Sequence, residues 1–329
     1  MAGPGPVAPQ RCAVFQWAQE HGEVGGVLTS HRQLTAQLRS AGHRVRYVDT
    51  GSPRRALQAA PELWRGRSLH LFHITRLWRA TVLAPVFAIL PGRTVLVLHS
   101  GSVGRQLDAM PSWRSRLLRA ALRAYDEVWA VNDEIGARLP AGLAGRVRVV
   151  TPFASEVDPS YAAGSPPRDP HLLTVATNAG LPHYRAEVAV EAVRLLRVPW
   201  PDARLRVLAY GNDGEQLAAL RAQIRGLGWV ELSFDAGPDE VHDVLSRSAV
   251  FLRPTEWDGD SVVVREALAA GARVVATDSS PRPAGVELSG PAPQDLADAV
   301  LLGGRVSDGS GLTTTTMLDA ATAAMRALR

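Results

Sequence analysis

Two carboxylates around a glycine-containing turn are the residues in this sequence best placed to do chemistry. The stretch 258–278 reads DGDSVVVREALAAGARVVATD, with Asp258 in the turn and Glu266 on the helix expected after it. The first N–H groups of a helix have no partner within the helix and can hold an anionic phosphate. Carboxylates beside such a helix start can accept hydrogen bonds from sugar hydroxyls. The segment therefore suits a ligand with phosphate at one end and hydroxyls around it, such as a nucleotide sugar.

The same segment has two other interpretations. Acids near a helix start are common, because they complement the helix dipole. Against that, the β-branched run 262–264 is a poor helix start, which favours a helix held by packing and a turn fixed for a purpose. Asp258 and Asp260 also form an Asp-x-Asp triplet. Two acids on one turn could hold a divalent metal, and this metal interpretation stays open from the residues alone.

Three further features could belong to the same site. His99 ends an apolar run, 94–99, at the position where open α/β sheets bind ligands. Gly25 and Gly26 stand between the first apolar run and a helical pattern, where backbone could approach a ligand closely. Arg185 follows the first strand expected in the second half of the chain. Each has an ordinary alternative, as a structural histidine, turn glycines, or one of many surface arginines.

The elements that must position these residues alternate along the chain. Short apolar runs predict strands over 13–18, 44–48, 69–74, 94–99, 128–131, 147–150, 172–176, 205–210, 230–234, 250–253 and 273–277. Helical patterns lie between many of them, at 25–40, 112–125, 185–197, 215–225, 238–248, 262–270, 294–302 and 317–328. Such alternation predicts an α/β fold with parallel sheets covered on both faces.

One segment without periodicity divides the chain into similar halves. Residues 151–170, TPFASEVDPSYAAGSPPRDP, are rich in Pro, Ser, Gly and Asp and read as a connector. We therefore expect a disordered leader at 1–10, a Rossmann-like domain at 11–152, a linker at 153–170, a second Rossmann-like domain at 171–316 and a C-terminal helix at 317–329. Two such domains facing each other would enclose a cleft, a common place for a ligand site.

Composition limits the alternatives. Of the 329 residues, 46% are hydrophobic, enough for full cores, and the single cysteine, Cys12, allows no intramolecular disulfide. The first ten residues lack the pattern of a signal peptide, and no apolar run approaches the ~20 residues of a membrane span. The formal charge is +4, and all 36 basic residues are arginine. This excess is too small and dispersed to indicate nucleic-acid binding. We expect a cytoplasmic protein.

The helix expected at 112–125, SWRSRLLRAALRAY, combines two kinds of face. Arg116, Arg119 and Arg123 cluster on one side, while Trp113, Leu117, Ala120 and Ala124 share another. Such a helix could lie on an anionic membrane surface, at the inner membrane face. The interpretation that the pattern favours is an ordinary amphipathic helix packed on the sheet.

These segments together resemble a retaining glycosyltransferase of family 4. The resemblance runs from about residue 11 to about residue 291. Its parts are the Gly25–Gly26 loop with LTSHRQLTAQLRSAGHRVRYV, the strand VLVLHSGS ending near His99, VWAVNDEIGARL, VVTPFASEVD, LLTVATNAGLPHYRAEVAVEAVRLL and DGDSVVVREALAAGARVVATD. The last resembles the Glu-x7-Glu segment of that family, with Asp258 in the first acidic position.

The resemblance implies the GT-B fold and the transfer of a sugar, a hexose for instance, from a nucleotide-diphosphate sugar to a hydroxyl acceptor. Transfer would retain the anomeric configuration and use no tightly held metal or other cofactor. By position, Glu266 would hold the ribose hydroxyls. Asp258 and the backbone of Gly259, Asp260, Ser261 and Val262 would touch the donor sugar and phosphates. His99 would lie beside the transferred sugar as a catalytic residue with Asp258. Gly25 and Gly26 would bring backbone close to the diphosphate or the acceptor. Arg185 would take the place of the family's phosphate-binding lysine.

Two other functions remain compatible with these residues. A nucleotide-sugar epimerase can use the same architecture, and a protein that binds a nucleotide sugar without turning it over is the third hypothesis. The sequence departs from the family pattern where Asp258 is one methylene short and where Asn178 stands near a position usually held by arginine. The acceptor, whether a glycan, a lipid-linked sugar or a small molecule, is not readable from the chain.

Overall fold

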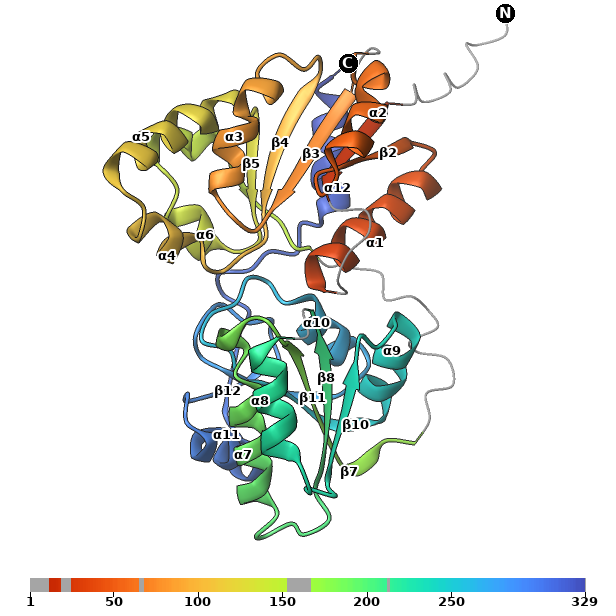
Figure 1. The fold of residues 1–329 in the computed structure, drawn as a ribbon, viewed down its shortest axis with the longest axis vertical. Coiled ribbons are helices and arrows are strands. Elements are labelled where there is room, and N and C mark those ends of the chain that lie inside the picture. The colour runs from red at the N-terminus through yellow and green to blue at the C-terminus, as the bar shows by residue number, and fades with distance from the viewer. Residues whose placement is uncertain (1–11, 19–24, 65–67, 153–166, 212–213, 329) are drawn as a thin grey trace, which may run out of the picture.

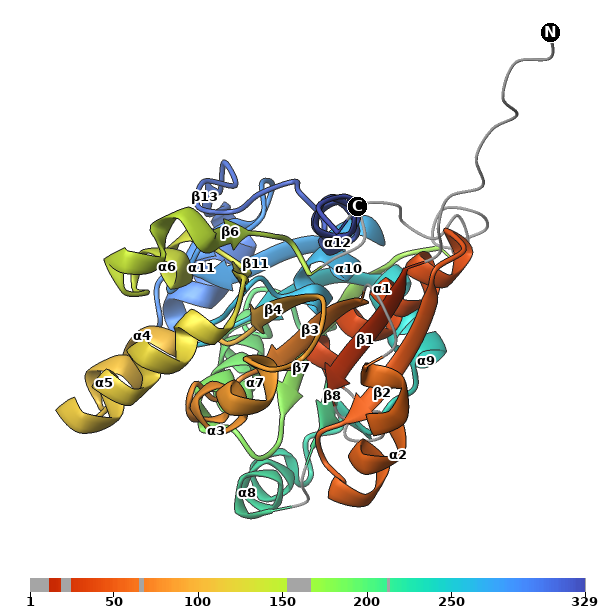
Figure 2. The same cartoon turned by 90° about the horizontal axis from the view of Figure 1, so that it is seen from above.

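The computed structural model consists of two α/β domains that face each other (Figures 1 and 2). It describes residues 12–18, 25–64, 68–152, 167–211 and 214–328. The leader expected at 1–10 and most of the linker expected at 153–170 lie outside the described residues. The second sheet already begins at Asp169, inside the range expected for the linker.

The first domain is built on a six-stranded sheet in the order β2-β1-β3-β4-β5-β6, and all its pairings are parallel. Its strands are β1 Ala13–Ala18, β2 Arg44–Asp49, β3 Ser68–Ile74, β4 Arg93–Leu98, β5 Glu127–Ala130 and β6 Val147–Val149. Its α-helices are α1 Gly26–Ser40, α2 Pro53–Leu63, α3 Trp78–Phe87, α4 Val103–Asp108, α5 Ser112–Ala121 and α6 Asp133–Ala137. Every residue of β3 is buried, as expected for a central parallel strand covered on both faces.

The second domain has a seven-stranded sheet in the order β13-β12-β11-β10-β7-β8-β9, parallel except for the β12–β13 pair. Its strands are β7 Asp169–Asn178, β8 Arg204–Tyr210, β9 Val230–Phe234, β10 Ser248–Arg253, β11 Arg273–Thr277, β12 Glu287–Ser289 and β13 Arg305–Val306. Its α-helices are α7 Ala186–Leu196, α8 Glu215–Ile224, α9 Pro238–Arg247, α10 Val262–Ala269 and α11 Pro293–Leu302. The predicted fold class, two facing Rossmann-like domains with parallel sheets, is confirmed.

The last helix, α12 Met317–Arg326, does not pack on the second domain that precedes it. Its apolar residues, among them Met317 and Met325, belong to the hydrophobic core of the first domain. The crossing is fixed by backbone hydrogen bonds, because Thr151 pairs with Thr315 and Met317. The chain therefore passes between the domains twice, and Figure 1 shows α12 beside β3 and α1.

The helix α10, which follows the turn at Asp258, is held by packing, as its sequence suggests. Val262 and Val264 are buried, so the β-branched start is compensated by burial in the domain core. The helix ends at Gly271, whose φ of +80° is the left-handed conformation that favours glycine. There the N–H of Ala272 bonds to the carbonyl of Ala267, and the N–H of Gly271 to that of Leu268. This closure satisfies carbonyls that a helix end would otherwise leave free.

Candidate functional site

A cavity of about 730 Å³ lies between the two domains. Residues at the carboxyl ends of several strands line it, including Ala18 of β1, Ile74 of β3, Tyr210 of β8 and Arg253 of β10. Ligands of open parallel sheets bind at this edge, where the strands end and the helices begin. The volume is in the range of small-molecule sites.

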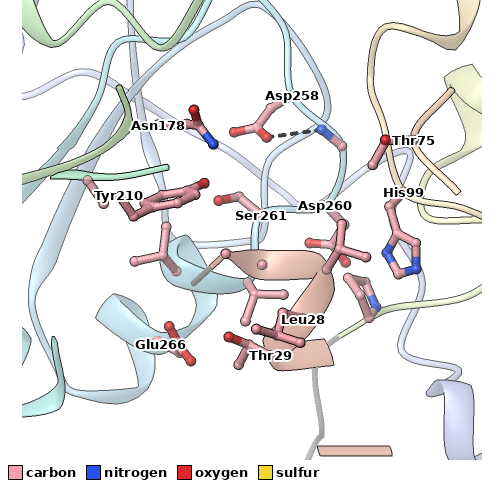
Figure 3. Close-up of a pocket in the computed structure, with 18 of the residues that line it drawn as sticks. Leu28, Thr29, Thr75, His99, Asn178, Tyr210, Asp258, Asp260, Ser261 and Glu266 are labelled. Carbon is pink, nitrogen blue, oxygen red and sulfur yellow. Dashed lines mark hydrogen bonds between the residues drawn. The ribbon is translucent and has the colours of Figure 1, made fainter. Parts of the chain in front are cut away.

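Two helices begin at the cavity from opposite domains (Figure 3). The first intrahelical bond of α1 runs from Thr29 to Gly25, and that of α10 runs from Arg265 to Ser261. The N–H groups of residues 26–28 and 262–264 therefore have no acceptor within their helices. Neither first turn contains an acidic residue. Gly26 contacts Val262, since a Cβ built there would lie 3.7 Å from its side chain. The two positive helix ends thus face one region of the cavity.

Glu266 stands at the side of the cavity formed by α10. Its carboxylate makes no hydrogen bond or ion pair with any residue that the structure describes. Burial raises its pKa to about 7, because the ionised form has lost water without gaining a partner. Apolar side chains share this side, including Ala236, Val241 and Leu245. A carboxylate that accepts hydrogen bonds, beside apolar side chains, suits a ligand ring that carries hydroxyl groups.

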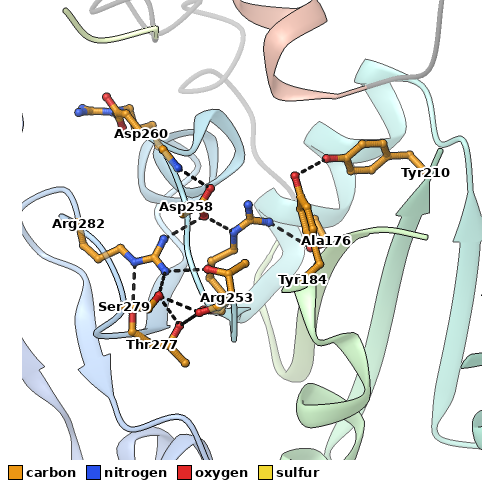
Figure 4. Close-up of polar contacts among 12 residues, drawn as sticks. Ala176, Tyr184, Tyr210, Arg253, Asp258, Asp260, Thr277, Ser279 and Arg282 are labelled. Carbon is orange, nitrogen blue, oxygen red and sulfur yellow. Dashed lines mark hydrogen bonds and ion pairs between the residues drawn. The ribbon is translucent and has the colours of Figure 1, made fainter. Parts of the chain in front are cut away.

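Asp258 is held by two buried arginines (Figure 4). Its Oδ2 accepts a hydrogen bond from Nε of Arg253 at 2.7 Å and from Nη1 of Arg282 at 3.0 Å. Its Oδ1 accepts the N–H of Gly259 at 3.1 Å. Burial by itself would raise the pKa of this carboxyl, but the two guanidiniums hold it below its ordinary value. One carboxylate between two guanidiniums leaves this cluster with a net positive charge.

Arg253 is the cation of this cluster that lines the cavity. It donates to Asp258 and, through Nη1, to the carbonyl of Ala176 at 3.2 Å, and its guanidinium lies 4.7 Å from the ring centre of Tyr184. Arg185, the cation expected from the sequence, is not among the lining residues described. Arg185 instead starts α7 in the left-handed conformation, with φ 54°. The structure therefore brings a cation to the cavity from β10.

Asp260 connects the turn to the interdomain crossing. Its Oδ1 accepts from Nε of Arg265 at 2.6 Å, and its Oδ2 accepts the hydroxyl of Thr151 at 2.9 Å. Both carboxylates of the Asp-x-Asp triplet are thus bonded to arginines. Ser261 caps α10 through its backbone and has no side-chain capping bond.

Three histidines with low pKa values line the opposite wall. They are His31 on α1, His73 in β3 and His99 after β4. Burial lowers the pKa of His31 to about 4 and that of His99 to about 3, and it holds the pKa of His73 well below the ordinary value. All three imidazoles are therefore neutral near pH 7, and each nitrogen either carries a hydrogen or accepts one.

A chain of hydrogen bonds fixes which nitrogen of His99 carries its hydrogen. The Thr35 hydroxyl donates to the carbonyl of His31 at 2.8 Å, so its oxygen accepts from Nε2 of Gln16 at 3.4 Å. Gln16 therefore turns Oε1 towards Nε2 of His73, at 2.5 Å. A carbonyl only accepts, so His73 carries its hydrogen on Nε2 and accepts through Nδ1 from Nε2 of His99 at 2.9 Å. His99 keeps a lone pair on Nδ1, which has no partner within the described chain.

Close backbone contact across the domain boundary requires two glycines. A Cβ on Gly101 would overlap the carbonyl of Asp258, and a Cβ on Gly259 would overlap the carbonyl of His99. The loop after β4 and the turn before α10 thus interlock. Gly25 is also placed at this boundary, since a Cβ there would lie 3.0 Å from the ring of Tyr210.

The sequence and the structure agree on part of the site. Gly25, Gly26, His99, Asp258, Gly259, Asp260, Ser261, Val262 and Glu266 all line the cavity. Sequence reasoning missed Arg253, His73 and Arg282. Arg253 and His73 had a readable signal, since each is a polar residue at the carboxyl end of an apolar run. Arg282 had none, because it lies in a loop 24 residues after the aspartate that it binds.

Comparison with known proteins agrees with this geometry. The family model described as glycosyl transferases group 1 matches residues 169–302, which run from β7 to α11. Sucrose-phosphate synthase from Thermosynechococcus elongatus superimposes with a TM-score of 0.63 and 15% identity, covering 97% of this chain and 95% of that one. Anabaena HepE, in complex with UDP and glucose, superimposes with a TM-score of 0.63 and 15% identity, covering 88% of this chain and 89% of that one. The fold is GT-B.

Within the GT-B fold the likeness also reaches longer proteins. The pneumococcal O-GlcNAc transferase GtfA, in complex with UDP and GlcNAc, matches with a TM-score of 0.55 and 13% identity over 84% of this chain. The chain spans only 56% of the length of that relative. No curated protein matches the sequence significantly. The cavity described above is therefore the interdomain cleft of a GT-B protein.

Proposed function

We propose that this protein is a retaining glycosyltransferase, of the family 4 type, which moves a hexose from a nucleotide-diphosphate sugar to a hydroxyl acceptor. The observation that carries the proposal is the convergence of two helix starts and one buried arginine on a single cavity. Free N–H groups from α1 and α10, with Arg253 beside them, suit a diphosphate. The matches to the group 1 family model and to structures bound to UDP support the same ligand class.

The two ends of the cavity suit the two ends of such a donor. Glu266 and the apolar wall of α9 would take the nucleoside, with the carboxylate accepting both ribose hydroxyls. His99 lies on the other side of the cavity in Figure 3 and would face the sugar, with Nδ1 accepting a hydrogen bond from a sugar hydroxyl. Because His31 and His99 are neutral, they add no positive charge that would draw the diphosphate away from the helix starts.

In the reaction, the bond between the anomeric carbon and the phosphate oxygen breaks, and a bond from that carbon to the acceptor oxygen forms. Negative charge develops on the leaving diphosphate, where the two helix starts and Arg253 would stabilise it; such electrostatic stabilisation is commonly the largest catalytic contribution. The acceptor proton would pass to the leaving phosphate oxygen on the same face of the sugar. This route fits the local carboxylates, because Asp258 and Asp260 are both bonded to arginines rather than free to attack.

Asp258 would act through Arg253. With both of its oxygens engaged, it orients the guanidinium and the turn at Gly259 instead of contacting the sugar directly. The same cluster would supply the positive charge that a divalent metal provides elsewhere, so we propose transfer without a bound metal. Addition of a chelator should then leave turnover unchanged.

The test is a thermal-shift series with nucleotide-diphosphate sugars, starting with UDP sugars, on three proteins. At a hundredfold excess over Kd, a specific ligand stabilises the native state by about 2.7 kcal/mol, which raises Tm. We expect this rise in the wild type and in Arg185→Met, and its loss in Arg253→Met, which leaves Asp258 paired with Arg282. Unliganded melting of each variant controls for folding.

The outcomes separate the alternatives. If the ligand-induced rise in Tm is lost equally in both variants, or only in Arg185→Met, the placement of the diphosphate is contradicted. A new sugar epimer in an NMR spectrum of donor and protein would indicate an epimerase instead. Binding without turnover against a panel of glycan, lipid-linked and small-molecule acceptors would indicate a binding protein.

A further inference from the structure

An exposed apolar surface lies on the outer side of the first domain, away from the sheet. Helices α3 and α5 lie side by side there, at the left of the first domain in Figure 1. The exposed large apolar residues, here called the α3–α5 surface, are Trp78, Val82, Val86, Ile89, Trp113 and Leu117. The exposed fractions of Val82, Ile89 and Trp113 are 59%, 64% and 53%, so these side chains gain little from the fold itself.

The structure argues against the ordinary interpretation of α5. That interpretation places Trp113, Leu117, Ala120 and Ala124 against the sheet, and of these only Ala124, just past α5, packs against the core. Instead α5 packs through Leu118 and Ala121, while Trp113, Leu117 and Ala120 are exposed. The apolar side read from the sequence therefore faces outward and continues the exposed side of α3.

Charge on the same two segments has a single sign. Residues 78–90 and 112–125 contain five arginines, at 79, 114, 116, 119 and 123, and no acidic residue. The guanidinium of Arg114 lies 5.2 Å from the ring centre of Trp78 and 5.0 Å from that of Trp113, whose rings meet edge to face. Arginine and tryptophan are residues that favour the boundary between lipid headgroups and acyl chains.

We propose that the α3–α5 surface docks on an anionic phospholipid bilayer. The apolar residues would enter the outer acyl region, and the arginines would contact lipid phosphates. A second copy of the chain fits less well, because a two-fold contact through this surface would bring the same arginines together without an acid to pair them. Within the described residues, no helix is long and apolar enough to cross a membrane.

The α3–α5 surface is adjacent in sequence to the lining of the interdomain cavity. Trp78 belongs to the surface, and the next residue, Arg79, lines the interdomain cavity. The mouth of the cavity would thus lie near the headgroups, within reach of an acceptor carried by lipid. The docking itself stands apart from the proposed glycosyl transfer, because it is measured by binding to lipid and not by turnover.

Co-sedimentation with vesicles tests the docking. The full-length protein is mixed with vesicles of phosphatidylcholine alone or of phosphatidylcholine with phosphatidylglycerol. We expect binding to the anionic vesicles, weak binding to the neutral ones, and a fall in binding as salt is raised. Each arginine near an anionic membrane surface adds to the electrostatic attraction. Arg116→Glu should therefore lower the partition constant for the anionic vesicles by roughly fivefold or more. Arg225→Glu, an exposed arginine of the second domain, is the matched control.

A second pair of variants tests the contribution of the apolar side chains to vesicle binding. Val82→Ser with Ile89→Ser should lower binding severalfold, whereas Val198→Ser with Leu302→Ser, at exposed aliphatic positions of the second domain, should not. Equal binding by all variants, or no preference for anionic vesicles, would overturn the proposal. So would a wild-type dimer in light scattering that Val82→Ser with Ile89→Ser converts to a monomer, since a second copy would then cover the surface.

Discussion

Glu266 illustrates how a residue proposed to bind the donor can oppose stability. A carboxylate that is largely buried and has no partner is costly, because it has lost hydration without compensation. Its raised pKa means that the folded protein binds a proton there more readily than the unfolded chain does. The cost is therefore small at pH 5, grows as the pH rises above the unfolded pKa, and is complete above about 7. A ligand with two adjacent hydroxyls would supply the missing donors.

The pH dependence of donor binding should report this carboxylate. Hydroxyls donate to the ionised form, so KM for a nucleotide-diphosphate sugar should fall by up to roughly tenfold between pH 6 and pH 8 as Glu266 ionises. The diphosphate of an intact donor does not titrate there, and His31, His73 and His99, whose pKa values burial lowers, stay neutral.

Glu266→Gln provides the comparison. Its KM should be higher at pH 8 and nearly independent of pH, while its unliganded Tm should exceed that of the wild type at pH 8 and approach it at pH 5. A pH-dependent KM that survives this substitution would assign the titration to another group.

The hydrogen-bond chain behind His99 predicts a spectroscopic signature. Long-range ¹H–¹⁵N correlation at pH 7 should show His99 as a neutral imidazole protonated on Nε2, with His99→Gln assigning its signals. Gln16→Met removes the carbonyl that orients His73. We expect a mixture of His99 tautomers in that variant and a lower kcat/KM. His99 protonated on Nδ1 in the wild type would contradict the chain, and so would an unchanged tautomer in Gln16→Met.

At the scale of elements, the loop after β4 and the turn before α10 behave as one unit. Gly101 and Gly259 allow their backbones to touch, so each domain helps to position the residue that the other presents to the cavity. His99 comes from the first of these segments and Asp258 from the second. The site is therefore complete only when the domains are in contact.

Gly101→Ala tests this interlock. The added methyl would overlap the carbonyl of Asp258, so we expect a more open average shape in small-angle X-ray scattering and a higher KM for the donor. Gly142→Ala is the matched control, because nothing lies within 4 Å of the position of its added Cβ. If both variants scatter and turn over like the wild type, the two segments are not coupled.

Many of the strands could be predicted from the sequence, for a physical reason. Buried parallel strands must be continuous apolar runs, so β1, β3, β4, β7, β8 and β10 were visible, and with them the edge at which His99 and Glu266 lie. Strand order is a tertiary property. The spacing of residues along the sequence therefore could not show that the strand of His73 lies beside the strand that ends before His99. The place of Arg253 at the end of an apolar run was readable, but its pairing was not, since that depends on Asp258 and Arg282 folding back to it. The short strands β12 and β13 carry too little apolar pattern to be seen.

At the scale of the whole molecule, the chain crosses between its two domains at two places, which are hydrogen-bonded to each other. The crossing at Thr151 and the return through α12 place the C-terminal helix in the first-domain core. The sequence predicted this helix but not its partner, because an amphipathic stripe does not state which apolar surface it will cover. The result is a GT-B protein whose domains are joined by two adjacent crossings, with an exposed apolar, arginine-containing surface on the first domain.

The central claim, that the cleft transfers sugar from a nucleotide-diphosphate donor with retention, can be tested before the acceptor is known. Water can act as a slow acceptor, and ¹H NMR distinguishes the anomer released first from the mixture that forms later. With an α-linked UDP sugar or another nucleotide-diphosphate donor, the wild type should release the α-anomer first, and Arg253→Met should release almost none. Initial release of the β-anomer, or no binding and no turnover with any donor tested, would contradict the account.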